Sequence, residues 1–312
     1  MLLNEYIEQV RRHIKEYLPE EFQDAELVLQ EQRKNNNKLL HGMSMKSPDR
    51  NICPLIYLDE YYEFHQSGMA MEDTFRLISK NYLLALDNVK FQKNMNFSYD
   101  HMKDKLFLCV VNAEKNQMML DSVPHQRIED LAVLHRCLIH SSNHHSGSIL
   151  VNSKLMDEWE ISEETLHEQA LRNMDRLFTP EFHPIEYNIS KMMGIPYHET
   201  EAAWRASDMF VLTNNQGYYG ASYLCCPDVL KWVSERMGGD FLLLPSSVDE
   251  IIILRQKDDM DISELQEIVE SVNQTAVGDM EYLSDSVYRY NNRDQELSII
   301  EGNDMQQGMK LL

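Results

Sequence analysis

Residues 209–256 read MFVLTNNQGYYGASYLCCPDVLKWVSERMGGDFLLLPSSVDEIIILRQ, and this stretch decides the fold. The short apolar runs 210–213 and 221–224 flank a polar Asn-Asn-Gln-Gly segment at 214–217. Apolar runs separated by turn-forming residues are typical of a β-hairpin. The pattern therefore predicts a strand, a tight turn and a second strand.

A helix and a second strand pair are expected next. Pro227 occupies a first helical position, and Gly238 lies just past the last apolar residue of the helical pattern. The runs 241–244 and 251–254 are apolar enough for buried strands, and Pro245 begins the turn between them. This order of elements indicates an antiparallel sheet packed against a helix.

A further helix and a further strand pair are predicted between residues 261 and 300. Asp261 and Glu264 have the spacing of a helix cap ahead of residues at i, i+3, i+4 and i+7, namely Leu265, Ile268, Val269 and Val272. The runs 287–290 and 297–300 predict a terminal hairpin. We expect residues 301–312 to form a frayed tail.

The N-terminal residues predict a smaller group of elements. Apolar residues at helical spacing favour a helix over residues 3–18, which Pro19 ends. Alternating residues on either side of Asn35, Asn36 and Asn37 predict a hairpin, because asparagine tolerates the left-handed backbone of short turns. Two aromatic-rich helices are expected over residues 57–64 and 72–86.

The middle of the chain mixes both patterns. Strands are predicted at 105–111, 128–139 and 149–151, with the polar segment 140–147 as a loop tip. A helix with Ser162 as its N-cap is predicted to about residue 178. Residues 179–207 contain three prolines and indicate a crossover carrying a short helix. Together these patterns predict an α+β fold with mixed or antiparallel sheets and amphipathic helices, in subdomains 1–104 and 105–300.

The charge of the chain is strongly negative and uneven. Residues 1–150 carry 17 basic and 21 acidic side chains, net −4, and residues 151–312 carry 12 and 30, net −18, which together give −22. A negative surface repels phosphate backbones and disfavours nucleic-acid binding. The acidity fits a well-solvated surface, mimicry of DNA, or the capture of a partner protein with a basic surface.

The sequence favours a cytoplasmic location. No apolar run approaches the ~20 residues that cross a bilayer, so no membrane association is expected, and the first residues form an amphipathic pattern rather than a secretion signal. The five cysteines are odd in number and lack a CxxC motif. We therefore expect reduced thiols.

Two parts of the chain resemble uncharacterised families. The segments GSILVNSKLMDEWEISEETLHEQALRN, MFVLTNNQGYYGAS and GGDFLLLPSSVDEIIIL resemble the C-terminal part of a family of bacterial proteins of unknown function. The segments NNNKLLHGMSM and CPLIYLDEYYEFHQSG resemble a related family frequent in anaerobic gut clostridia. The resemblance implies a bacterial, cytoplasmic α+β protein and carries no catalytic residues over to this chain.

Each candidate for chemistry has a simpler structural interpretation. His135, His140, His144 and His145 offer imidazole ligands, but without thiolates or carboxylates at standard spacing we predict no metal and no cofactor. A strand rather than a helix follows Ser246 and Ser247, which argues against a nucleophilic serine. Cys226 precedes a predicted helix, whose N-terminus lowers the pKa of a thiol.

Paired carboxylates are equally ambiguous. Neighbouring acids on a strand point to opposite faces, so cooperation requires residues distant in sequence to meet, such as Asp130 and Glu250. The candidate functional cluster is therefore a dispersed set, consisting of His125, Asp130, His135, His140, Glu250 and Cys226.

Two functions remain open from the sequence. The first is a non-enzymatic protein-interaction module with an acidic surface, and we favour it because no catalytic motif is present. The second is a hydrolase-like enzyme with a cleft between the two halves that uses dispersed histidines and carboxylates. A solvent-facing apolar patch rimmed by acids would favour the first, and acids beside a histidine in a cleft would favour the second.

Overall fold

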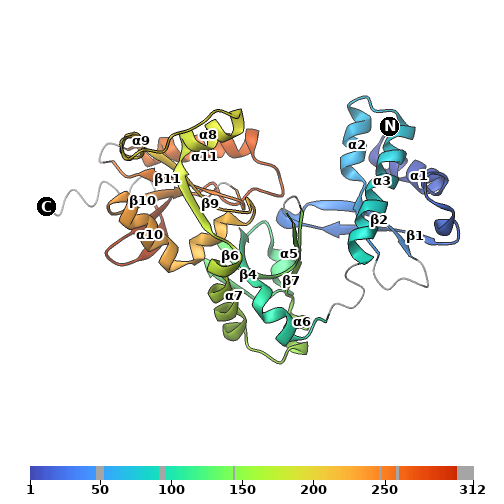
Figure 1. Cartoon of the computed structure of the whole chain (residues 1–312), viewed down its shortest axis with the longest axis horizontal. Helices are drawn as coiled ribbons and strands as arrows, with labels where there is room; N and C mark the ends of the chain where they lie inside the picture. The colour runs from blue at the N-terminus through green and yellow to red at the C-terminus, as the bar shows by residue number, and fades with distance from the viewer. Residues whose placement is uncertain (47–52, 91–95, 143–144, 246, 258–259, 301–312) are drawn as a thin grey trace. The chain divides into compact units, whose positions relative to one another are not determined.

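The computed structural model describes residues 1–46, 53–90, 96–142, 145–245, 247–257 and 260–300. The chain divides into two compact units, residues 1–97 and 98–312 (Figure 1). Within these ranges all strand pairs are antiparallel and lie in three sheets, so the α+β prediction is confirmed. None of the helices in the described ranges is long and apolar enough to cross a membrane.

The first unit is a three-stranded sheet covered by helices. Its strands lie in the order β1-β2-β3, and Asn36 and Asn37 adopt the left-handed backbone expected for the connection between the first two. The predicted hairpin and helices are confirmed, with the bounds α1 (Leu3–His13), η1 (Ile14–Tyr17), η2 (Glu20–Phe22), β1 (Glu26–Arg33), η3 (Asn35–Asn37), β2 (Leu39–Lys46), β3 (Ile56–Tyr57), α2 (Asp59–Gln66) and α3 (Met71–Lys90).

The core of this unit is rich in aromatic residues. Tyr6 and Val10 of α1 are buried against Met43 and Met45 of β2 and Tyr82 of α3. The hydroxyl of Tyr82 donates to the carbonyl of Met45 at 3.2 Å and accepts from its N–H at 3.3 Å. The buried hydroxyl of Tyr82 therefore both donates and accepts a hydrogen bond in the core.

The second unit contains two sheets. In the smaller one, β6 pairs with β4 on one edge and with β5 and β7 on the other; in the larger one, the order is β13-β12-β10-β11-β9-β8. Their bounds are β4 (Leu106–Asn112), β5 (His125–Ile128), β6 (Leu131–Ser142), β7 (His145–Leu150), β8 (Pro180–Pro184), β9 (Met209–Asn214), β10 (Phe241–Leu244), β11 (Ile251–Arg255), β12 (Tyr288–Asn291) and β13 (Glu296–Ile299).

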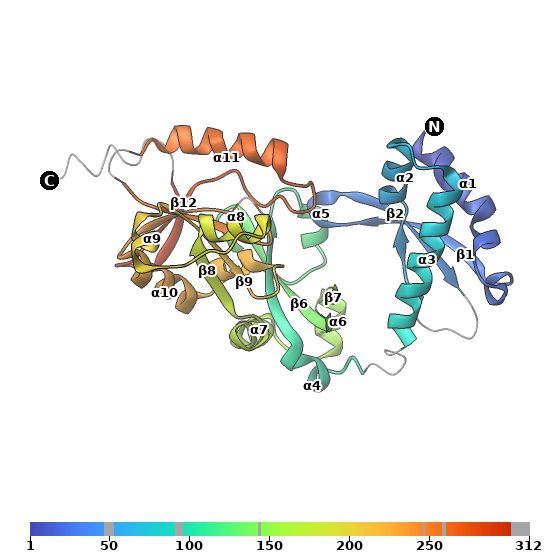
Figure 2. The same cartoon turned by 45° about the horizontal axis from the view of Figure 1, so that its top comes forward.

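Helices cover both faces of the larger sheet. Figure 2 shows α10 and α11 on opposite sides of it. The helices of this unit are α4 (Tyr99–Met102), η4 (Lys103–Lys105), α5 (Gln117–Leu120), α6 (Ser153–Glu158), α7 (Glu163–Leu177), α8 (Ile185–Met193), α9 (Glu201–Ala206), η5 (Gly220–Cys225), α10 (Pro227–Met237) and α11 (Ile262–Ala276). Ser162 caps α7 and Asp261 caps α11 through their side chains, as predicted.

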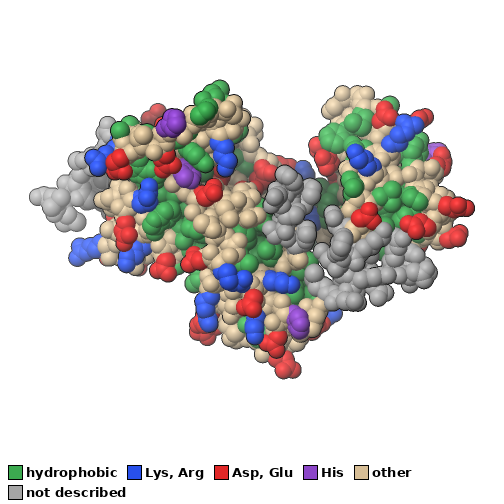
Figure 3. All heavy atoms as spheres, viewed as in Figure 1, with side chains coloured by type: hydrophobic (Ala, Val, Ile, Leu, Met, Phe, Trp, Pro, Cys, Tyr) green, Lys and Arg blue, Asp and Glu red, His purple; other side chains and the backbone are tan. Residues whose placement is uncertain are grey.

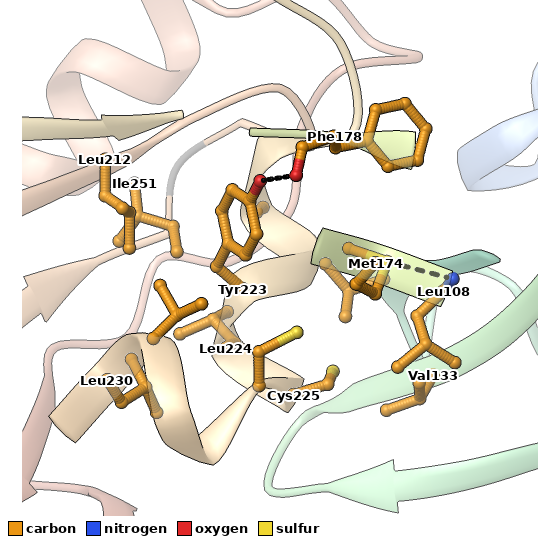
Figure 4. Packing of buried hydrophobic residues seen from close by; sticks show 14 of the residues in the cluster. Leu108, Val133, Met174, Phe178, Leu212, Tyr223, Leu224, Cys225, Leu230 and Ile251 are labelled. Carbon is orange, nitrogen blue, oxygen red and sulfur yellow. Dashed lines mark hydrogen bonds between the residues drawn. The ribbon is translucent and has the colours of Figure 1, made fainter. Parts of the chain in front are cut away.

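One large core joins the two sheets of this unit. Figure 4 shows Tyr223 of η5 donating its hydroxyl to the carbonyl of Phe178, at 3.2 Å, beside Leu224 and Cys225. Leu108 and Met174 pack in the same cluster. Because η5 is buried at every position, this segment is an internal part of the core rather than a surface turn.

Three expectations are corrected. Residues 221–224 form the helix η5 instead of a strand, because β9 already pairs with β8 and β11 on its two edges. The crossover at 179–207 begins with an unpredicted strand, β8, whose prolines are tolerated at a sheet edge. The predicted loop at 140–147 is mostly strand, since β6 and β7 extend to Ser142 and His145. The predicted tail lies outside the described residues.

Candidate functional site

His135 is fully buried in β6 and contacts a second histidine. Its Nε2 lies 3.3 Å from Nδ1 of His167 in α7, and its Nδ1 lies 3.3 Å from the carbonyl oxygen of Pro124. Burial, reinforced by the neighbouring His167, lowers the pKa of His135 to about 4, and burial also lowers the pKa of His167. His135 is therefore neutral at physiological pH and packs in the core, whereas His167 is half-buried.

Asp130 lies in the turn between β5 and β6 and accepts hydrogen bonds from the C-terminal segment. Ser284 donates its hydroxyl at 2.7 Å and Ser286 at 3.3 Å, and Tyr288 donates its hydroxyl as well. Burial, together with the carboxylate of Asp130, raises the pKa of Tyr288. These hydrogen bonds connect the smaller sheet to β12 and the residues before it, so Asp130 has a structural role.

Cys226 is buried immediately before α10. Burial, with smaller effects from Asp175 and Asp228, raises the pKa of its thiol to about 12. The expectation that the helix N-terminus lowers this pKa is therefore wrong, because loss of hydration outweighs the helix dipole. A protonated, buried thiol is not a nucleophile.

The remaining candidates are dispersed. His125 lies half-buried in β5, where its Nδ1 contacts the carbonyl oxygen of Val123 at 2.8 Å. Glu250 follows Asp249 just before β11, and partial burial of its carboxyl, followed by the charge of Asp249, raises its pKa. The backbone of His140 pairs with Gly147, but its side chain lies outside the described part of the structure.

The five predicted residues whose side chains the structure describes lie in different elements. Among the described contacts, none joins two of them. Within the same part of the chain, no three His, Cys, Asp or Glu residues form a group that could hold a metal ion. The dispersed cluster therefore stays a prediction from the sequence.

A surface feature in the crossover region was not predicted. Helix α8 carries Ile185, Ile189, Met192 and Met193 at i, i+4, i+7 and i+8, which places them on one face of the helix. Met192 is 88% exposed and Met193 is 67% exposed, and Ile189 and Ile195 are about half exposed. We call Ile189, Met192, Met193 and Ile195 the α8 apolar surface. Figure 3 shows hydrophobic side chains at the surface where Figure 1 places α8.

The opposite side of α8 anchors the helix to the sheet. Tyr187 stacks on the ring of His183 in β8, with the ring centroids 4.2 Å apart. His183 pairs in register with Val211, and Val211 pairs with Ile252, which packs against the core beneath α11. Helices α8 and α11 therefore share one face of the larger sheet, and the apolar surface points away from it.

The crossover segment that contains this surface is rich in glutamate. Residues 181–202 contain four glutamates and one lysine. Burial and the charges of Glu186 and Glu199 raise the pKa of Tyr197, which places both carboxylates near the segment that follows α8. Glu199 also contacts Nδ1 of His183 at 2.9 Å. Glu186 and Glu199 thus lie near the segment that follows α8.

The signal for this surface was present in the sequence. The i, i+4, i+7, i+8 spacing of apolar residues in α8 indicates an amphipathic helix, but such spacing normally marks the face that is buried. The stacking of Tyr187 on His183 shows that the other face packs against the sheet. The orientation of the helix therefore required the structure.

One family model matches nearly the whole chain. It describes a family of unknown function, DUF5688, and it aligns with residues 3–292. This single match spans both parts of the chain that resemble uncharacterised families. No curated protein and no solved structure is significantly similar to the chain.

Proposed function

We propose that this chain, which belongs to the DUF5688 family of unknown function, is a non-enzymatic module that binds another protein through the α8 apolar surface. The observation that supports this function is the outward face of α8. Three large exposed apolar side chains lie on one face of α8 and a fourth, Ile195, follows the helix, and such patches are typical of interaction sites. Burying them against a partner would remove apolar area from water.

The excess of glutamate in this segment indicates the chemistry of the partner. Four glutamates against one lysine in residues 181–202 would repel an acidic segment and attract a basic one. We propose a partner segment with apolar side chains along one face and Lys or Arg residues beside them. The charge of −18 over residues 151–312 would accelerate its association at low salt.

The methionines suit such a surface. Met192 and Met193 have flexible, unbranched side chains that adapt to partners of different shape. The same proposal places the protein in the bacterial cytoplasm: the sequence resemblance supports the bacterial origin, and the five unpaired cysteines support the reducing compartment.

The enzyme alternative has weaker support. His135 is buried and neutral, and the thiol of Cys226 is protonated. Asp130 already accepts hydroxyl hydrogen bonds from Ser284, Ser286 and Tyr288. A hydrolase would have to use other groups.

A pair of designed peptides tests the binding function. One is an amphipathic helical peptide of Leu and Lys, and the other has Glu in place of every Lys. We expect the full chain to bind the Lys peptide and not the Glu peptide, with an affinity that falls as salt rises. The combined substitution Met192→Ser and Met193→Ser should weaken binding about tenfold, because it removes exposed anchors of the interface.

Met118→Ser is the matched control, because Met118 is also strongly exposed but lies in α5, outside the α8 apolar surface. It should leave the affinity unchanged. Equal binding of both peptides, or equal weakening by the control, would show that association is non-specific. Hydrogen exchange should protect the backbone amides of residues 185–197 when the Lys peptide is bound.

A further inference from the structure

The first unit contains a pocket that the proposed function does not use. It has a volume of about 280 Å³ and lies between the N-terminal turns of α1 and the strands β1 and β2. Ile7 and Leu29 line it with apolar atoms, and Glu8, Glu31 and His41 line it with groups that carry or accept charge. This volume is at the lower end of ligand pockets, so it fits a small molecule or a single side chain.

The hairpin register explains why polar groups gather there. Glu31 pairs directly with His41, and two residues further along the same face Leu29 pairs with Met43. Side chains at alternate positions share a face of a strand, so this polar pair continues the face that packs under α1. Met43 is buried in the core, whereas Glu31 and His41 lie beyond it and line the pocket.

Asp59 holds His41 in one orientation. Its carboxylate accepts the backbone N–H of His41 at 2.7 Å and contacts the ring Nδ1 at 3.0 Å. A carboxylate only accepts hydrogen bonds, so Nδ1 carries the proton in this contact. In the neutral ring, Nε2 is then an acceptor, and it lies 4.0 Å from Oε1 of Glu31.

The charges at the pocket favour a cation. Glu8 and Glu31 both line it, and the carboxylate of Asp59 contacts the ring of His41. No lysine or arginine is among the residues that line this pocket. Arg11 contacts Glu8 at 3.4 Å, but both side chains are about half exposed or more, so this pair is weak and solvent-screened.

We propose that this pocket binds the ammonium group of a short aliphatic amine, either a free small molecule or the end of a lysine side chain. Glu8 and Glu31 pair with the ammonium, and Nε2 of His41 accepts one of its hydrogen bonds. Ile7 and Leu29 contact the methylene groups. Because α8 lies in the other unit, this site can be tested independently of the proposed protein-binding function.

The test uses the full chain with ¹⁵N-labelled histidine and n-butylammonium as the probe. We expect saturable changes in the imidazole signals of His41 on titration, and none with n-butanol, which has the same chain without the charge. The combined substitution Glu8→Gln and Glu31→Gln should weaken binding about tenfold, since it removes two charge interactions at the rim.

The matched control is Glu26→Gln with Glu72→Gln, which removes the same charge from exposed positions of the same unit outside the pocket. It should leave the affinity unchanged. Absence of saturable binding, or equal weakening by the control pair, would overturn the proposal. A short glycine peptide with one central lysine separates the two sources. If the peptide binds more tightly than butylammonium and acetylation of its lysine abolishes binding, the natural ligand is a lysine side chain. If the peptide binds more weakly, the natural ligand is a free amine.

Discussion

His135 shows what burial does to a titratable residue in this protein. Its ring is enclosed in β6 and contacts His167, so protonation would place a charge in the core without a counter-ion. The candidate that the sequence offered as a catalytic or metal-binding group is therefore a packing residue. Its lowered pKa should instead make the free energy of unfolding depend on pH.

We expect the second unit to lose stability between pH 6.5 and pH 4. The pKa of His135 falls from its ordinary value of 6.5 to about 4 on folding, so the unfolded chain binds more protons in this window. Above pH 6.5 the ring of His135 is neutral in both states and does not lower the free energy of unfolding. As the pH falls, the free energy of unfolding decreases, by about 3 kcal/mol at pH 4. Urea unfolding followed by tryptophan fluorescence measures it, because Trp159, Trp204 and Trp232 all lie in this unit.

The variant His135→Gln keeps hydrogen-bonding capacity and removes the titration. Its stability should depend less steeply on pH over this window than that of the unmodified chain. His198→Gln, at an exposed position in the same unit, should leave the slope unchanged. A slope that is the same in both variants would contradict the assignment.

Cys226 gives a second prediction at the level of single residues. Its thiol is buried and its pKa is raised to about 12, and Cys109, Cys137 and Cys225 are buried as well, whereas Cys53 is only half-buried. We expect one thiol per chain to react rapidly with Ellman's reagent at pH 8, and all five after denaturation. Substituting Cys53→Ser should remove the rapid phase. A rapid phase that survives this change would place reactivity at a buried thiol.

At the level of elements, the sequence predicted those with strong local signals. Helix α7 begins after Ser162, and α10 begins at Pro227 and ends just before Gly238, because capping residues determine helix ends locally. The orientation of an element depends on contacts between distant residues. For α11, Val269 is buried as expected, but Ile268 and Val272 are about half exposed. The α8 apolar surface escaped prediction for the same reason.

Segment η5 is the clearest failure of local patterns, and Gly220 explains it. Residues 221–224 are apolar and follow a turn, yet the chain coils into a buried 3₁₀ helix that begins at Gly220. Its N–H donates to the carbonyl of Asp249 at 3.1 Å. A β-carbon at this glycine would lie 2.3 Å from the same carbonyl oxygen, so only glycine allows the approach.

Gly220→Ala should therefore destabilise the second unit by about 2 kcal/mol or more, since the obstructing atom belongs to the backbone and the core is closely packed. Urea unfolding followed by tryptophan fluorescence measures the loss. Gly147→Ala is the control, because its β-carbon would meet nothing within 4 Å. Equal stability of the two variants would show that the backbone near Asp249 adjusts freely.

On the scale of the whole molecule, each unit has its own hydrophobic core. The core of residues 1–97 is drawn from α1, β2, α2 and α3 and includes Tyr6 and Tyr82. The buried clusters of residues 98–312 are drawn from the two sheets and their helices. We propose that the units are separate domains, with the boundary a few residues before the one suggested by the sequence.

Expression of the two segments by themselves tests this division. We expect residues 98–312 to unfold cooperatively with the tryptophan emission and urea midpoint of the full chain, because all three tryptophans and the core cluster they belong to lie within the segment. Residues 1–97 should show helical circular dichroism and their own transition. As a control, residues 130–312 omit β4, whose seven residues are all buried, and should fail to fold. A large drop in the midpoint of residues 98–312 would instead mean that the first unit completes the core of the second.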